Sequence, residues 1–117
     1  MSAARLLIVD DEEKLLDLLR RYMERRGFEV ETCSSSEAAW ERFSKDPQGF
    51  AMVITDLTLA GMSGTELIER VRGRNPKIPA LITSGYPHVP ALQGVSFLQK
   101  PFLPQMLLDE VERALKR

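Results

Sequence analysis

The chain has 117 residues, of which 44% are apolar and 28% are charged, and its formal net charge is −1. This length and balance are typical of one globular domain with room for a hydrophobic core. The near-neutral charge, without a basic face, gives no reason to expect nucleic-acid binding, and no apolar run reaches the roughly 18 residues of a membrane span. We therefore expect neither a nucleic-acid-binding protein nor a membrane protein.

The single cysteine and the N-terminal residues bear on the compartment. Cys33 has no partner for a disulfide within the chain, and the N-terminus lacks the apolar stretch of a signal peptide. A cytoplasmic protein is the simplest interpretation.

The first part of the chain predicts a strand followed by a helix. A strand is expected over residues 5–9, where the apolar run 6–9 ends at Asp10 and Asp11, and acids at this point suit the start of a helix. Apolar residues then recur at helical spacing from Leu15 to Met23, and Gly27 is placed to end the helix.

A second strand and a second helix follow. Residues 28–33 alternate between the two faces of a strand, which is typical of a sheet edge. Ser35 and Ser36 then open a helix that runs through Trp40 and Phe43, and residues 46–49 form a turn by composition.

The middle of the chain predicts a buried strand, a loop and a third helix. The apolar run over residues 52–55 ends at Asp56, and the loop over 57–64 contains Gly61 and Gly64. A helix is expected from about Thr65 to Arg72, before the Asn75-Pro76 stop.

The last two predicted strands end at Ser84 and at Lys100. The residues between these strands, 85–94, include two prolines and two glycines, and they are too few for an ordinary crossover helix. We therefore expect a fourth helix at this point to be shortened or absent, with His88 exposed in the connection and holding no metal. A final helix is expected to begin near Pro104.

Polar side chains stand at the ends of four of these strands. Asp10 and Asp11, Asp56, Ser84 and Lys100 each follow an apolar run. Parallel strands separated by helices bring their carboxyl ends to one edge of a sheet, where ligands bind beside a switch in strand order. Carboxylates, a hydroxyl and an ammonium at one edge suit a divalent cation and a phosphoryl group. An alternative for Asp10 and Asp11 is that they simply cap the first helix.

These residues, in this order, resemble the receiver domain of two-component response regulators over essentially the whole chain. The matching segments are Asp10-Asp11, Ile54–Leu57, Gly61–Gly64, Thr83–Gly85 and Lys100–Phe102. The resemblance implies an α/β fold, a doubly wound five-stranded parallel sheet in the order 2-1-3-4-5. From the chain length and the end of the given sequence after the last predicted helix, we also expect a single domain over residues 1–117 without an effector domain.

The resemblance implies a role for each residue of the site. Asp56 would accept a phosphoryl group, and Mg²⁺ would be held by Asp11, Asp56 and the backbone carbonyl of Thr58, with Asp10 acting through water. Lys100 would pair with the phosphoryl group. Ser84 would bond to a phosphoryl oxygen, and Phe97 occupies the position of the aromatic switch. The Lys100–Pro101 bond is often cis in this family, and Ala60 stands where proline is usual.

The implied function is a phosphorylation-dependent signalling switch rather than a turnover enzyme. The partner that donates the phosphoryl group would be a sensor histidine kinase or a histidine phosphotransfer protein. The output would be regulation of a partner protein or onward transfer of the phosphoryl group.

Three alternatives stay open at this stage. The first is a receiver excised from a hybrid histidine kinase, the second is a pseudo-receiver that only docks, and the third is an aspartyl-phosphate hydrolase. The hydrolase would need a second acid two residues after the nucleophile, where this chain has Thr58. The basic residues Arg70, Arg72, Arg74 and Lys77 are either a solvated helix end or a surface for an acidic partner.

Overall fold

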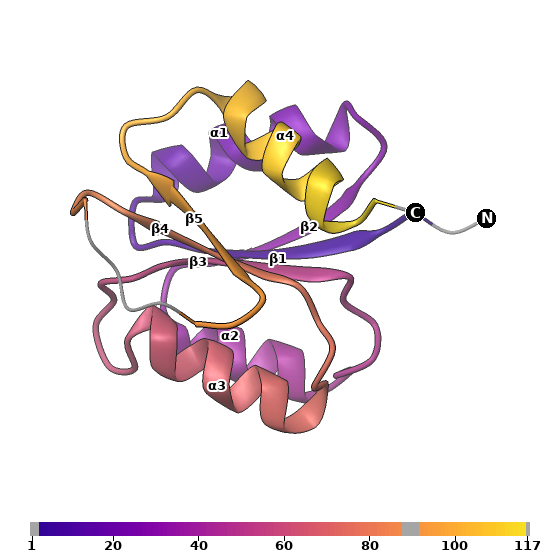
Figure 1. The fold of residues 1–117 in the computed structure, drawn as a ribbon, viewed down its shortest axis with the longest axis vertical. Coiled ribbons are helices and arrows are strands. Elements are labelled where there is room, and N and C mark those ends of the chain that lie inside the picture. Colours follow the sequence, from indigo (N-terminus) through magenta and orange to yellow (C-terminus); the bar gives the residue numbers. More distant parts are fainter. Residues whose placement is uncertain (1–2, 88–91, 117) are drawn as a thin grey trace.

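The computed structural model describes residues 3–87 and 92–116. It consists of one parallel sheet with helices on both faces (Figure 1). His88, predicted to be exposed, lies outside the described residues. In chain order the elements are β1 (Arg5–Val9), α1 (Glu13–Glu24), β2 (Glu29–Cys33), α2 (Ser36–Ser44), β3 (Met52–Asp56), α3 (Gly64–Arg74), β4 (Ala80–Ser84), β5 (Val95–Gln99) and α4 (Pro104–Ala114).

The five strands lie in the order β2-β1-β3-β4-β5, and every neighbouring pair is parallel. This confirms the predicted doubly wound sheet. The order reverses at β1, since β2 lies on one side of it and β3 on the other. The register pairs Val9 with Thr55. The next residues, Asp10 after β1 and Asp56 at the end of β3, therefore lie side by side at the same edge of the sheet.

Two hydrophobic layers hold the helices against the sheet. On one face, α1 and α4 pack through residues such as Leu19 and Leu107 against the side chains of Ile8 and Ile54. On the other face, α2 and α3 cover the strands (Figure 1), with Phe43 fully buried. All residues of β3 and β4 are buried, which is why these strands read as continuous apolar runs.

Local signals set the helix starts. The hydroxyl of Ser35 accepts a hydrogen bond from the Ala38 amide at 3.1 Å, and Ser63 caps α3 in the same way. Gly27 has a φ of 92°, which permits the turn after α1. The third helix is longer than predicted: it continues to Arg74, directly before Asn75.

The connection between β4 and β5 contains no helix among its described residues, 85–87 and 92–94. The expectation of a shortened or missing fourth crossover helix is met over that part of the connection. Because β5 is the last strand in the order, it forms one edge of the sheet, with Val95 and Phe97 half-buried.

Candidate functional site: an acidic cluster at the carboxyl edge of the sheet

Three carboxylates meet where β1 and β3 end. Asp10, Asp11 and Asp56 each place one carboxylate oxygen within 4.8 Å of the others. Asp10 is 3% exposed and Asp56 is 8% exposed, whereas Asp11 faces solvent. The structure therefore brings together the three acids that the sequence singled out.

Asp10 also stabilises the start of α1. Its Oδ1 accepts a hydrogen bond from the Glu12 amide at 2.8 Å, so the helix-capping alternative describes one part of its role. Its other oxygen, Oδ2, accepts a hydrogen bond from Lys100 at 2.7 Å. Because each oxygen has a separate partner, Asp10 links the helix start to the cluster.

Lys100 supplies the cation of this cluster. Its Nζ lies 2.7 Å from Asp10 and 3.2 Å from Asp56, and only 23% of its side chain is exposed. Its backbone amide donates to the carbonyl of Ser84 at 2.7 Å, which fixes its place at the end of β5. The following Lys100–Pro101 peptide bond is cis, as expected.

The electrostatics of the pair follow from burial and charge. Burial raises the pKa of Asp56 above its ordinary value of 3.8, and this effect prevails over the opposing attraction of Lys100. Burial alone would lower the pKa of Lys100, but its hydrogen bonds and its attraction to Asp10 and Asp56 raise this pKa above 10.5. Lys100 is therefore a firmly charged counter-ion for two crowded acids.

Close backbone packing holds Asp56 in place. Its carboxylate oxygen Oδ1 lies 3.4 Å from the Thr58 amide, and the neighbouring Leu57 amide donates to Thr83 at 2.8 Å. A Cβ added at Gly64 would stand 2.2 Å from the carbonyl oxygen of Asp56. Only glycine therefore lets α3 begin against the backbone of the residue that ends β3.

Ser84 lies at the end of β4, one residue beyond the Thr83 that pairs with Asp56 in the sheet. It is 1% exposed, and its hydroxyl accepts a hydrogen bond from the Tyr86 amide at 2.9 Å. The Ser84 hydroxyl is therefore hydrogen-bonded within the turn that follows β4. Its predicted bond to a phosphoryl oxygen stays a prediction.

Phe97 lies opposite Ile82 in the pairing of β4 with β5. It is half-buried and packs against the cluster of Ile68, Ala80 and Ile82. Its contacts are those of a core residue at the sheet edge, and its predicted switching role stays a prediction.

Sequence reasoning missed a contact that anchors the loop after Asp56. Ser36 is fully buried, and its hydroxyl donates to the carbonyl of Ala60 at 3.0 Å. Next to it, Gly61 has a φ of 81°, and a Cβ at this residue would overlap the carboxylate of Glu37. The start of α2 therefore contacts the loop that carries Thr58. A polar residue at a helix start signals only a cap, so the sequence held no sign of this distant partner.

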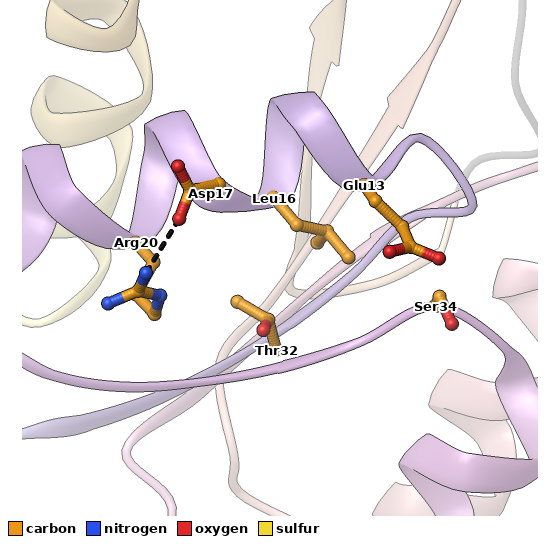
Figure 2. A pocket seen from close by; sticks show the side chains of 6 residues that line it. All are labelled: Glu13, Leu16, Asp17, Arg20, Thr32 and Ser34. Atoms are coloured by element: carbon orange, nitrogen blue, oxygen red, sulfur yellow. Dashed lines mark hydrogen bonds and ion pairs between the residues drawn. The ribbon is translucent and has the colours of Figure 1, made fainter.

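A polar groove lies between α1 and β2. Figure 2 shows Glu13, Asp17 and Arg20 of α1 facing Thr32 and Ser34 across it. Arg20 donates to Asp17 at 2.6 Å and to Glu24 at 3.2 Å. The positive charge of this groove is therefore already paired within α1 and is not shared with the acidic cluster.

A more apolar depression of about 460 Å³ lies beside Lys100. Leu15 of α1 and Pro101 and Phe102 after β5 line it. Leu103, the next residue along, is 68% exposed. This surface leaves room for a partner molecule next to the acids.

Comparison with known proteins identifies the family. The response regulator receiver domain matches residues 6–112 of the chain. The chain belongs to this receiver domain family. Its members are phosphorylation-dependent signalling switches rather than turnover enzymes, are phosphorylated by histidine kinases or phosphotransfer proteins, and generally bind Mg²⁺ at an acidic pocket.

Curated relatives are considerably longer than this chain. The C4-dicarboxylate transport transcriptional regulatory protein DctD of Pseudomonas aeruginosa is 30% identical over 98% of the chain and 26% of its own length. The response regulator protein FleR of the same organism is 33% identical over 95% of the chain and 24% of its own length. The chain thus spans about a quarter of these relatives.

Solved structures of receiver domains share the fold. The receiver domain of the hybrid histidine kinase CckA has a TM-score of 0.88 and 28% identity, covering 97% of this chain and 100% of that one. The chemotaxis response regulator CheY4 of Vibrio cholerae has a TM-score of 0.88 and 26% identity, with the same coverage. Over residues 3–87 and 92–116, the helices of this receiver fall short of the length and apolarity that a membrane span requires.

Proposed function

We propose that this receiver is a switch in which Asp56 accepts a phosphoryl group from a sensor histidine kinase or a histidine phosphotransfer protein. The observation that carries the proposal is the shared contact of Lys100 with Asp10 and Asp56, at 2.7 and 3.2 Å, inside a cluster of three acids. A lysine that already bridges the nucleophile and its neighbour is placed to pair with a phosphoryl oxygen. We also place this function in the cytoplasm, where the family generally acts.

The donor set suits Mg²⁺. Asp10, Asp11 and Asp56 offer oxygen atoms within 4.8 Å of one another, and Mg²⁺ prefers one or two carboxylates with water and phosphate oxygens. We propose that Asp11, Asp56 and the Thr58 carbonyl hold the ion and that Asp10 acts through water. When bound, Mg²⁺ neutralises charge on the carboxylates and on the incoming phosphoryl group.

The remaining chemistry belongs to the side chains. A carboxylate oxygen of Asp56 attacks the phosphorus of a phosphohistidine, the P–N bond breaks, and the electron pair leaves with the imidazole nitrogen. Lys100 offsets the charge on the phosphoryl oxygens. The depression lined by Leu15, Pro101 and Phe102 is the surface on which we place the donor protein.

The switch would follow from a difference in hydrogen bonding. The Ser84 hydroxyl accepts from the Tyr86 amide here, and a phosphoryl oxygen on Asp56 would offer it an acceptor for its own proton. A ligand shifts an equilibrium only by its different affinity for the two states. We propose that this bond draws Ser84 inward and that Phe97 follows, and that the output is regulation of a partner protein or onward transfer.

Intact-mass measurement after incubation with acetyl phosphate and Mg²⁺ tests the proposal. We expect a gain of one phosphoryl mass that disappears with a chelator, with Asp56→Asn and with Asp11→Asn. Asp17→Asn, an acid of α1 outside the cluster, is the matched control and should label normally. Equal labelling of Asp56→Asn would refute the site, and the absence of labelling with both acetyl phosphate and a phosphorylated histidine phosphotransfer domain would favour a docking-only receiver.

A further inference from the structure

A second groove lies at the opposite edge of the sheet from the acidic cluster. It is a cavity of about 500 Å³ at the amino ends of β4 and β5, bordered by the ends of α3 and α4. Ile78, Val95 and Ala114 contribute apolar surface, and Arg72, Lys77 and Arg113 contribute positive charge. We call it the basic groove.

The positive charge of the basic groove is poorly balanced. None of its lining residues is acidic, although the chain as a whole has a net charge of −1. Over the described part of the chain, neither Arg72 nor Lys77 forms an ion pair. Arg113 does form an ion pair, with Glu110 at 2.7 Å. The groove therefore keeps a net positive charge.

Arg72 is held in a fixed position by neutral acceptors. Its two terminal nitrogens donate to the carbonyls of Gln93 and Gly94 at 2.6 and 3.0 Å. Gly94 has a φ of 75°, and a Cβ there would lie 3.1 Å from the guanidinium. Carbonyls order the side chain without cancelling its charge, so Arg72 presents a preorganised cation.

From this arrangement we infer that the basic groove docks a peptide segment of a partner protein that carries both carboxylates and apolar side chains. The carboxylates would lie against Lys77 and Arg113, and an apolar side chain would cover Val95 and Ala114. A small inorganic anion would leave that apolar surface exposed. A nucleic acid would gain little from it, because no aromatic side chain lines the groove for a base to stack on.

The structure divides the basic residues after β3 into two sets. Arg72 and Lys77 line the groove, whereas Arg70 and Arg74 are exposed elsewhere on α3. This division provides a matched control, because Arg70 and Arg74 are exposed, as are Lys77 and Arg113 of the groove, but do not line it.

The test is fluorescence anisotropy with a short fluorescein-labelled peptide of alternating glutamate and leucine, measured on the whole chain. We expect saturable binding that weakens about tenfold in the double variant Lys77→Glu/Arg113→Glu, since two exposed charge pairs are lost together. The control double variant Arg70→Glu/Arg74→Glu should bind as the wild type does. Circular dichroism of each variant checks that the fold is retained.

Several outcomes would overturn the inference. Equal weakening in both double variants would reduce the effect to general charge attraction. Equal binding of a peptide with glutamine in place of glutamate would show that the carboxylates are not recognised. Equal binding of a peptide with serine in place of leucine would show that the apolar side chains are not recognised. Displacement of the peptide by a DNA duplex would favour nucleic acid, and no saturation below about 1 mM would leave the groove without this ligand.

Discussion

At the scale of single residues, the acidic cluster is a compromise between burial and charge. Asp56 is nearly buried beside Asp10, and the pKa of Asp56 is raised by that burial despite the nearby ammonium of Lys100. The folded protein therefore bears a cost for keeping this carboxylate ionised at neutral pH. Such a cost is typical of groups kept for chemistry rather than for stability.

The substitution Asp56→Asn should stabilise the metal-free protein at pH 7. The raised pKa means that the folded state binds the proton of Asp56 more tightly than the unfolded chain does, so stability falls as pH rises from 3.8 through the folded-state pKa. We expect a higher Tm for the variant at pH 7, with the difference shrinking as the pH falls toward 3.8. Thermal unfolding in chelator across this pH range measures it, and a gain that grew as the pH was lowered would contradict the assigned sign.

The substitution Lys100→Ala should have the opposite effect. It leaves Asp10 and Asp56 without their cation, and we expect a loss of about 2 kcal/mol in chelator, below that of a fully buried pair because the lysine is partly exposed. The pKa of Lys100 is raised, so this stabilisation is complete below 10.5 and is lost as pH rises through the folded-state pKa. Urea unfolding measures the difference, with Lys14→Ala, an exposed lysine of α1, as the control. A loss that stayed constant at high pH would argue against an electrostatic origin.

At the scale of elements, α2 and the loop after β3 act as one unit. Ser36 contributes a buried hydroxyl at the helix start, and the loop contributes the carbonyl of Ala60. The loop also carries Thr58, whose carbonyl is a proposed ligand. A helix on one face of the sheet thus limits the positions that this loop can take.

Replacing Ser36 by alanine should destabilise the protein by about 1 kcal/mol, because the buried hydroxyl and its hydrogen bond to the Ala60 carbonyl are lost. Ser34→Ala changes an exposed serine two residues earlier and should be almost neutral. Equilibrium unfolding in urea compares the two. Equal effects would mean that the hydrogen bond to Ala60 adds nothing to folding.

The sequence predicted strands more completely than contacts. Four strands could be found because an apolar run stops at a polar residue, as β3 does at Asp56 and β4 at Ser84, and β2 could be found from the alternation of its residues. The cluster of acids followed from parallel strand ends meeting at one edge. The partner of Ser36 could not be found, since Ala60 lies 24 residues away and no periodic pattern reports it. The setting of Arg72 was hidden for the same reason.

At the scale of the whole molecule, the site depends on the complete sheet. Asp10 follows β1, Asp56 ends β3 and Lys100 follows β5, so their meeting requires the pairing of β1 with β3, β3 with β4 and β4 with β5. Anything that binds the assembled cluster but not the unfolded chain must therefore stabilise the entire fold.

Addition of Mg²⁺ should raise the unfolding temperature of the wild-type chain. At a concentration ten times its Kd, a single bound ion contributes about 1.4 kcal/mol. Differential scanning fluorimetry with increasing Mg²⁺ measures the shift. Asp11→Asn should abolish most of it, whereas Asp17→Asn should retain it. A shift of equal size in both variants would indicate weak binding elsewhere on the surface.

The distance along the chain between Asp10 and Lys100 also has a consequence for synthesis. The ribosome synthesises Asp10, Asp11 and Asp56 before Lys100, because Lys100 follows β5, the last strand of the sheet. Before that point the emerging polypeptide lacks the last parallel pairing, that of β4 with β5. A shortened translation product that stops before Lys100 would hold Asp56 without its counter-ion, so the acidic cluster is completed only once β5 and Lys100 have been synthesised.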